Sequence, residues 1–438
     1  MADTPVHTNK SDPKLPLAGK KVLEITTAWA GPMLGRILRN FGAEVVKLET
    51  LSNVDNWRGA VTGDDPARYP DGDKGEHPWN RSAWFNTQSL GKQSLGIDAK
   101  SPAARPAIEA IVKGCDIVIS NFAAGALTRL KLDYEHLRAL RSDTILLELN
   151  VTGEGGPLWD TRGVGPTMEA LAGMTPLTGY GDGVPVRTGP AYVDPIGAMN
   201  GAMAVLLAVY HHEKTGQGQR IEMAQREALM HLYGEHILLQ AEDGKSAAAD
   251  GNRAAHAAPH DAFRSLGEDD WVAIAVFGDV QWQALCRAMG RADLATDPRF
   301  AHAADRVKNA DALFPLVEAW TARRDKHAIA AELQGLGIAA APVSSGQDIF
   351  NDPQLRATSF LYQVDHPEAG RHWYHSLPFH FEGADPSPPS AAPLLGQHTD
   401  AILRGWAGLD DAAIAQLHAE GVAHQADLPS TAAARHKT

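Results

Sequence analysis

The stretch that decides the fold is "KKVLEITTAWAGPMLGRILRNFGAEVVKLET", residues 20–50. It starts with a short apolar run at Val22–Ile25, passes through a Gly-Pro turn into a helical segment, and returns to a second apolar run at Glu44–Leu48. A strand, a helix and a second strand in this order are typical of a β-α-β unit, in which the strands are parallel. We therefore expect a parallel sheet that binds its ligand beyond the carboxyl ends of its strands.

The same alternation continues along the chain. Helical patterns near Pro102–Lys113 and Tyr134–Leu140 are followed by the apolar runs "DIVISNF" (116–122) and "TILLELN" (144–150). Further on, the pattern predicts helices over 194–212 and 225–240 and a strand within "DDWVAIAVF" (269–277). We predict an α/β protein, in which a large, Rossmann-like parallel-sheet domain carries a smaller inserted α+β domain.

The chain has 438 residues, which is long for a single core and predicts more than one domain. We expect the N-terminal part of the large domain, with the ligand site, at 15–225. A linker and the small domain follow at 226–335. A return linker and the C-terminal part of the large domain occupy 336–425. Residues 1–14 and 426–438 read as flexible tails.

Composition excludes several classes of protein. The net charge of −13 argues against nucleic acid as a partner. The only cysteines, Cys115 and Cys286, form neither a disulfide framework nor a metal-type spacing, and the histidines also lack ligand spacing. The N-terminus has no apolar segment, and no apolar run approaches the roughly 20 residues of a membrane helix. We expect a cytoplasmic protein with no metal, no membrane partner and no permanently bound cofactor.

One acidic residue has two readings. In "TGPAYVDPIGAMNGAMAV" (188–205), Asp194 precedes Pro195 and a run of small apolar residues that reads as a helix. Asp followed by Pro is a favoured helix N-cap, and that role alone explains the pattern. A carboxylate at a helix start is also oriented and kept ionised by the helix dipole, as a nucleophile requires.

Two basic residues stand where a parallel sheet binds ligands. Lys100, in "SLGIDAKS", and Arg129, in "GALTRL", each follow a strand-like segment. The alternative for both is an ordinary surface charge. The phosphate-binding patterns GxGxxG and GxxxxGK[ST] are both absent, so the usual dinucleotide and nucleoside triphosphate sites are not expected.

Several stretches together resemble the family III CoA-transferases, the CaiB/BaiF group that includes formyl-CoA transferase. The resemblance runs in order from about residue 16 to 422. The matching text is "LAGKKVLEITTAWAGP", "FGAEVVKLE", "DIVISNF", "AGALTRL", "GPAYVDPIGAMNGAMAVLLAV", "HEKTGQGQ", "APHDAFRS", "DPRF", "NDPQL" and "PLLGQHT". No single motif is decisive, but the ordered combination is specific.

The resemblance implies that Asp194 is the nucleophile. It would form an anhydride with the acyl group of an acyl-CoA and then a thioester with CoA, which passes to the incoming acid. CoA thioesters are thus substrates rather than bound cofactors. The resemblance also implies residues that bind CoA or line the thioester site: Ala28, Trp29, Lys100, Asn121, Phe122, Arg129, Arg162 and Gly165.

The chain also departs from the family pattern. Gly165 stands where many members have an acidic residue, and Glu169 follows four residues later, which bears on the preferred acyl group and makes Glu169 the next candidate nucleophile. The apolar loop "GVGPTMEALAGM" and Trp29 would suit a bulky or aromatic acid. By family habit the donor would be succinyl-CoA.

The resemblance further implies an interlocked homodimer, or a hetero-oligomer with a related subunit. That interface, or the loop 246–258, would exclude water from the site. Three alternatives remain open: an α-methylacyl-CoA racemase, a non-catalytic subunit of a heteromeric transferase, and a CoA-binding scaffold. The racemase needs a His and Asp pair, which "TRGVGPTMEA" lacks, and Asp194 would make this chain the active subunit of a heteromer.

Overall fold

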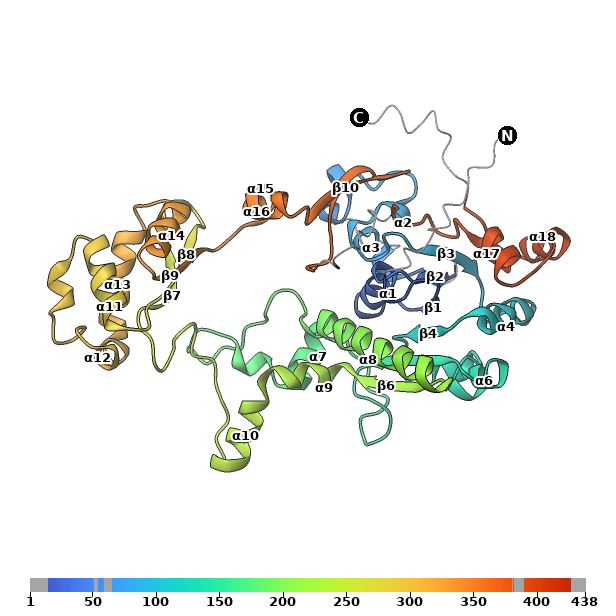
Figure 1. The fold of residues 1–438 in the computed structure, drawn as a ribbon, viewed down its shortest axis with the longest axis horizontal. Coiled ribbons are helices and arrows are strands. Elements are labelled where there is room, and N and C mark those ends of the chain that lie inside the picture. The colour runs from blue at the N-terminus through green and yellow to red at the C-terminus, as the bar shows by residue number, and fades with distance from the viewer. Residues whose placement is uncertain (1–14, 51–53, 59–64, 380, 382–389, 427–438) are drawn as a thin grey trace. The chain divides into compact units, whose positions relative to one another are not determined.

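The computed structural model describes residues 15–50, 54–58, 65–379, 381 and 390–426 (Figure 1). The chain divides into two compact units. Unit 1 comprises residues 1–174, 189–237 and 359–438, and unit 2 comprises residues 175–188 and 238–358.

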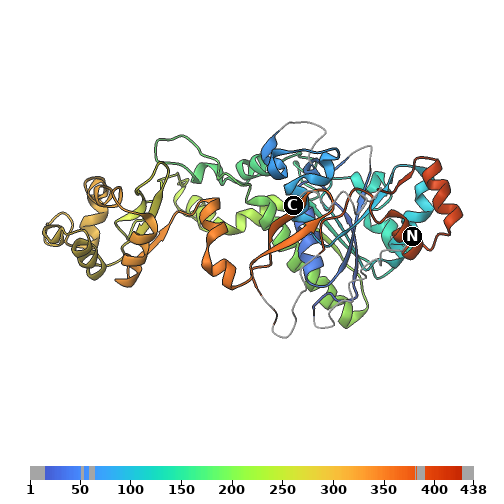
Figure 2. The same cartoon turned by 90° about the horizontal axis from the view of Figure 1, so that it is seen from above.

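Unit 1 contains a seven-stranded sheet in the order β12-β3-β2-β1-β4-β5-β6 (Figures 1 and 2). Its strands are β1 (Lys21–Ile25), β2 (Glu44–Glu49), β3 (Gln93–Ile97), β4 (Ile117–Ser120), β5 (Ile145–Asn150), β6 (Arg220–Ala224) and β12 (Ala423–His424). All pairs are parallel except β12 with β3. The chain order of the parallel strands reverses between β1 and β4, and in such sheets this switch point is where ligands bind.

Helices link the strands of unit 1. They are α1 (Ala30–Asn40), α2 (Pro78–Arg81), α3 (Ala83–Gln88), α4 (Arg105–Gly114), α5 (Ala126–Arg129), α6 (Tyr134–Leu140), α7 (Gly165–Ala172), α8 (Val193–Thr215), α9 (Gln225–Met230), α17 (Thr399–Gly405) and α18 (Asp411–Ala419). The helix α10 (Gly234–Asp243) runs across the division between the units.

The two faces of the sheet explain why its strands read as continuous apolar runs. Leu23 and Val46 face a core built with α4, α17 and α18. Their neighbours Val22 and Val45 face a second core built with α1 and α8. Because both faces are buried, successive side chains are apolar and strict alternation is lost.

Unit 2 is a small α+β body. Its sheet has the order β7-β8-β9 and is antiparallel, with β7 (His260–Arg264), β8 (Trp271–Ala275) and β9 (Ala339–Pro342). Its helices are α11 (Asp279–Ala288), α12 (Ala303–Lys308), α13 (Ala310–Thr321), α14 (Lys326–Gly335), α15 (Gly346–Asn351) and α16 (Pro353–Ala357). One core, centred on Trp282 and Phe300, joins the sheet to its helices. The α/β class, with a large parallel and a small antiparallel sheet, is confirmed.

Some local expectations need correction. The single helix predicted over 225–240 is broken by a 3-10 turn at His231–Tyr233, where the Tyr233 hydroxyl donates to the carbonyl oxygen of Ala172 at 2.7 Å. The antiparallel hairpin of β10 (Leu361–His366) and β11 (Gly370–His375) was not anticipated. The division between the units falls at 174/175, 188/189, 237/238 and 358/359. The predicted span of 226–335 for the linker and small domain stays a prediction.

The helix α8 bears on the membrane question. Among the described residues it is the one helix long and apolar enough to cross a membrane, by length and composition, with a mean hydropathy of 1.4 in its best window. The expectation that no apolar run approaches this length is therefore wrong for α8. Half of that window is buried inside the protein, and α8 packs on α1 and β5. These contacts are those of a core helix of the α/β unit.

Candidate active site

Asp194 lies in the first turn of α8, which begins at Val193. It does not cap its own helix, because the residue before the helix is Tyr192 and no side chain makes a capping bond there. The N-cap interpretation is therefore wrong. Instead the Asp194 carboxylate accepts a hydrogen bond from the backbone N–H of Ala30, the first residue of α1. The first N–H groups of a helix have no partner within the helix. Asp194 therefore supplies an acceptor at the start of α1 rather than at the start of its own helix, α8.

The environment of Asp194 shifts its proton affinity. Burial raises its pKa from 3.8 to about 6, the Ala30 N–H lowers it, and the nearby Glu169 carboxylate raises it. The group is mostly ionised at neutral pH, yet far less strongly solvated than a surface carboxylate. A partly desolvated carboxylate that is still ionised at neutral pH is suited to nucleophilic attack.

Gly165 closes one side of this carboxylate. A Cβ atom at Gly165 would lie 2.8 Å from Oδ2 of Asp194 and 2.1 Å from Cβ of Ala191. Gly165 is also the first residue of α7, so the N-termini of α1, α7 and α8 converge on Asp194. The structure therefore gives a reason for glycine at this position: no side chain fits between α7 and the nucleophile candidate.

Glu169, in α7, is a second carboxylate close to Asp194. Its side chain is buried, and Oε1 accepts the backbone N–H of Tyr192 at 2.6 Å. Glu169 therefore holds the residue that leads into α8, and its charge acts on Asp194. The two carboxylates therefore differ in role. Glu169 holds the backbone of Tyr192, whereas Asp194 lies at the start of α1.

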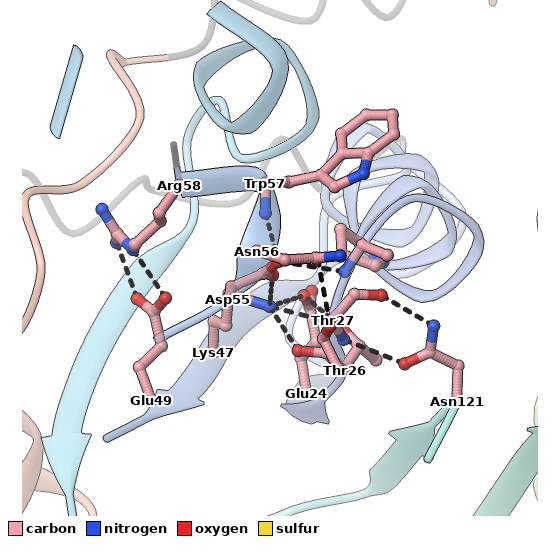
Figure 3. A network of polar contacts seen from close by, with 12 residues as sticks. Glu24, Thr26, Thr27, Lys47, Glu49, Asp55, Asn56, Trp57, Arg58 and Asn121 are labelled. Atoms are coloured by element: carbon pink, nitrogen blue, oxygen red, sulfur yellow. Dashed lines mark hydrogen bonds and ion pairs between the residues drawn. The ribbon is translucent and has the colours of Figure 1, made fainter. Parts of the chain in front are cut away.

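The first βα turn is held across the switch point of the sheet. Ala28 has a left-handed backbone with φ of 61°, and Trp29 follows as the N-cap residue of α1. Asn121, directly after β4, accepts the N–H of Thr27 at 2.9 Å and donates to the carbonyl oxygen of Thr27 at 2.8 Å (Figure 3). Asn121 thus joins the ends of β1 and β4, and Ala28, Trp29, Asn121 and Asp194 come together.

A buried charge network supports the same turn and was not predicted from the sequence. Oδ1 of Asp55 accepts the N–H of Ala28 at 3.0 Å and that of Trp57 at 2.9 Å, while Oδ2 pairs with Lys47 at 3.1 Å (Figure 3). Lys47 is fully buried and also contacts Glu24 at 3.3 Å. Burial lowers the pKa of Lys47, but Asp55 and Glu24 together raise it above its ordinary value, so it stays charged.

Three tryptophans extend outward from this turn. The ring centroids of Trp29 and Trp57 are 5.3 Å apart, and those of Trp57 and Trp84 are 5.2 Å apart. The guanidinium of Arg68 lies 4.3 Å from the centroid of Trp84. We call Trp29, Trp57 and Trp84 the tryptophan ladder. Four of the chain's ten tryptophans fall between residues 29 and 84, and this enrichment was the sequence signal that could have pointed to it.

The other candidate residues lie around the carboxyl edge of the sheet. Lys100 follows β3 and is exposed, and Arg129 is exposed at the end of α5, with a Cβ at Gly125 placed 3.4 Å from its Nη1. Phe122 packs against the core beside β4, and Arg162 is exposed in the loop before α7. Lys100, Arg129 and Arg162 are thus accessible to anionic groups but are not part of the cluster around Asp194.

The potential metal ligands among the described residues and a cavity in unit 2 both leave the Asp194 cluster as the candidate site. The described ranges contain no group of three or more His, Cys, Asp and Glu side chains arranged to hold a metal. A cavity of about 500 Å³ in unit 2 lies on the sheet of β7, β8 and β9. Alanines line most of it, with His260 and Asp261 among its few polar residues. It contains no residue of the Asp194 cluster.

Comparison with known proteins identifies similar chains. The family profile described as CoA-transferase family III matches residues 17–399. A succinyl-CoA:mesaconate CoA-transferase of Haloarcula hispanica is 33% identical over 87% of this chain and 94% of its own length. A succinyl-CoA–D-citramalate CoA-transferase of Chloroflexus aurantiacus is 28% identical over 94% of this chain and 98% of its own. The crystal structure of a CaiB/BaiF family protein from Brucella suis superimposes with a TM-score of 0.78 at 30% identity, covering 88% of this chain and 98% of the other.

Proposed function

The chain belongs to CoA-transferase family III, and we propose that it transfers CoA from succinyl-CoA to a bulky or aromatic carboxylic acid through covalent intermediates on Asp194. CoA thioesters are substrates of such enzymes. The single observation that carries the proposal is the Asp194 carboxylate, partly buried, bonded to the Ala30 N–H and placed where three helix N-termini meet.

The proposed reaction balances without an external energy source. A carboxylate oxygen of Asp194 attacks the acyl carbon of the donor thioester, the C–S bond breaks, and an aspartyl anhydride and CoA thiolate result. The thiolate attacks the aspartyl carbonyl, which forms the aspartyl-CoA thioester and releases the donor acid. The acceptor carboxylate attacks the aspartyl carbonyl of this thioester, which releases CoA thiolate and forms a second anhydride between Asp194 and the acceptor. The thiolate then attacks the acceptor's carbonyl carbon in this anhydride. The product is the new acyl-CoA, and Asp194 is again a free carboxylate.

Each attack places negative charge on a carbonyl oxygen beside Asp194. Backbone N–H groups at helix N-termini stabilise such an oxyanion, typically by about 3–4 kcal/mol for one well-placed donor. We propose that the start of α1 supplies such groups at Ala30 and Gly31. The start of α7 can add only the N–H of Gly165, because Pro166 has none and the N–H groups of Thr167 and Met168 donate to the carbonyl oxygen of Val164. The neighbouring Glu169 raises the free energy of the ionised Asp194, and this cost is removed when Asp194 becomes a neutral anhydride or thioester.

The CoA moiety is proposed to follow the carboxyl edge of the sheet. Ala28, Trp29, Asn121 and Phe122 would line the pantetheine arm, because they lie at the switch point between β1 and β4. Exposed cations around this edge would bind the phosphates: Lys100, Arg129 and Arg162. Gly165 would border the thioester. We propose no permanently bound cofactor or metal, and a cytoplasmic location.

We propose an interlocked homodimer, or a hetero-oligomer with a related subunit. Its support is an uncovered apolar stripe on α8, with exposed fractions of 53% at Met199, 56% at Met203, 61% at Leu207 and 62% at Tyr210. These positions share one helix face. Light scattering should report a dimer mass, whereas a compact monomer at micromolar concentration would contradict the assembly.

Trapping of the intermediate tests the nucleophile. Incubation of the full-length protein with succinyl-CoA and no acceptor should leave the aspartyl-CoA thioester on Asp194. Hydroxylamine should convert Asp194 to a hydroxamate, and borohydride should reduce it to an alcohol, both located by peptide mass spectrometry within "AYVDPIGAM". Asp194→Asn should remove the label and the transfer, whereas Asp160→Asn, at an exposed acid, should retain both.

The outcomes separate the alternatives. Label on Glu169 or Asp160 would keep the transferase class and move the nucleophile. A racemase would form no covalent adduct, and a CoA-binding scaffold would release its CoA on denaturation. A non-catalytic subunit would carry no label, and after addition of a related active chain the label would appear on that chain instead.

A further inference from the structure

The tryptophan ladder connects the proposed nucleophile to the protein surface. At its inner end, Trp29 directly precedes Ala30, whose N–H donates to the Asp194 carboxylate. At its outer end, Trp84 is 42% exposed and Arg68 lies over its ring. A substrate whose acyl carbon reaches Asp194 must therefore pass close to Trp29.

The ladder is held in place rather than loosely packed. One carboxylate oxygen, Oδ1 of Asp55, accepts the N–H groups of both Ala28 and Trp57. These bonds fix the backbones that carry Trp29 and Trp57 relative to each other, and the Lys47 ammonium neutralises Asp55 from below (Figure 3). An indole pair fixed in this way is preorganised, so binding a ligand against it costs little ordering.

One polar atom of the ladder is unused. Nε1 of Trp29 is buried and has no hydrogen-bond partner among the described residues. Buried indole N–H groups usually find an acceptor. A carbonyl or hydroxyl oxygen of a bound acyl group would supply one.

The charges around the ladder disfavour a second carboxylate against the rings of Trp29 and Trp57, so the free carboxylate of a succinyl donor must lie away from these rings. A second carboxylate near Trp29 would need a cation. In the described part of the chain, Lys47 beside this turn is fully buried against Asp55 and Glu24, and the part-exposed Arg68 lies at the outer end of the ladder, over Trp84. Arg58 is also fully buried, and its Nε and Nη2 both donate to the Glu49 carboxylate at 2.7 Å. The ring pairs of the ladder are tilted, and such pairs favour a further aromatic ring in an edge-to-face contact.

We infer that the tryptophan ladder is the acyl-group recognition surface and that the enzyme takes carboxylic acids bearing an aromatic ring. This inference rests on the proposed function of Asp194. The ring lies against Trp29 and Trp57, and an oxygen of the acyl group accepts the Trp29 Nε1–H. Asp55 acts as a positioning residue, since it reaches the substrate only through the two backbones it holds.

An acceptor panel on the wild-type protein tests the inference directly. The aspartyl-CoA form, made with succinyl-CoA, is offered trans-cinnamate, phenylacetate, mesaconate or succinate, and the new acyl-CoA is measured by mass. We expect kcat/KM for at least one aromatic acid to exceed that for both diacids by about tenfold or more. Equal or better transfer to a diacid overturns the inference. Failure to form the aspartyl-CoA species at all overturns the proposed function instead.

Ladder variants give the second test. Trp57→Leu should raise KM for the aromatic acid by about tenfold and change kcat less, while Trp57→Phe should restore most of the loss. Trp373→Leu is the matched control, because Trp373 is 40% exposed on β11 and lies outside the ladder. Melting temperatures show whether each variant folds, and Trp84→Leu, at the exposed end of the ladder, carries the test if Trp57→Leu does not fold. A Trp57→Leu or Trp84→Leu protein that folds and discriminates between the acids as the wild type does would overturn the inference.

Discussion

The backbone N–H of Ala30 donates a hydrogen bond to the Asp194 carboxylate, so that a residue in the first turn of α8 caps the N-terminus of α1. This relationship brings together two segments far apart in the sequence. It places a carboxylate at the switch point of the parallel sheet and leaves it partly desolvated beside Glu169.

The first prediction concerns the pH dependence of covalent labelling. Only the ionised Asp194 attacks the donor, and its pKa is raised to about 6. The single-turnover rate of hydroxylamine-sensitive labelling should therefore rise between pH 5 and 7 with a midpoint of about 6 and level off above it. A rate that stays constant down to about pH 4.5 would mean that an acid with an ordinary pKa is the nucleophile.

The same shift predicts a stability effect of Asp194→Asn. The folded protein binds the Asp194 proton more tightly than the unfolded chain does, because the pKa of Asp194 is raised in the fold. The contribution of this proton to the free energy of unfolding is therefore fully present below about pH 4 and is lost as pH rises through about 6. At pH 8 the charged Asp194 costs on the order of 3 kcal/mol. Asp194→Asn, which keeps an acceptor for Ala30, should then raise the free energy of unfolding by about 1–3 kcal/mol at pH 8 and by much less at pH 4.

Asp133→Asn is the control for that measurement. Burial acts to raise the pKa of Asp133, but hydrogen bonds from the side chain and backbone of His136 lower it overall. The stability from ionised Asp133 is present above its unfolded pKa and is lost as pH falls through the folded value. Its replacement should lower stability at pH 8, opposite in sign to Asp194→Asn. Urea titrations at both pH values measure the two effects, and the same sign for both would contradict the assignment.

Gly165→Ala should damage catalysis more than folding. The added Cβ would lie 2.8 Å from Oδ2 of Asp194 and 2.1 Å from Cβ of Ala191, so one of these groups must move. A displaced nucleophile should lower the labelling rate by about 10- to 100-fold. In the Gly165→Ala background, Ala191→Gly should recover stability but not the labelling rate, because the contact with Asp194 remains. Full recovery of the rate would show that Gly165 only packs against Ala191.

Gly35→Ala should destabilise unit 1. Its Cβ would lie 1.8 Å from Oε2 of the buried Glu24, which pairs with Lys92 at 2.7 Å. Displacing this buried carboxylate from its lysine should cost about 2–5 kcal/mol. Gly405→Ala, at the end of α17 with nothing within 4 Å, is the control and should change stability by no more than about 1 kcal/mol. A melting temperature for Gly35→Ala equal to that of the control would show that Glu24 relocates freely.

Much of the fold could be predicted from local pattern. The apolar runs that became β1, β2, β4 and β5, with helices between them, identify a parallel sheet, because strands buried on both faces cannot alternate with polar residues. The hairpin of β10 and β11 was missed because runs such as "GRHWYH" carry few of the apolar residues that mark a strand. The break near Tyr233 was missed because its cause is a hydrogen bond to Ala172, distant in sequence.

The candidate site, like the fold, could be predicted only in part from the sequence. The sequence by itself determined that an acid stands at the start of a small-residue helix, since Asp194, Pro195 and the helical pattern are adjacent in the chain. Only the tertiary structure decided what this acid does there. The donor from Ala30, the neighbouring charge of Glu169, and the Asp55 carboxylate that fixes Ala28 and Trp57 come from separate segments. Hydrogen bonds and desolvation depend on distances of a few ångströms in space, and no local pattern records which distant groups will meet.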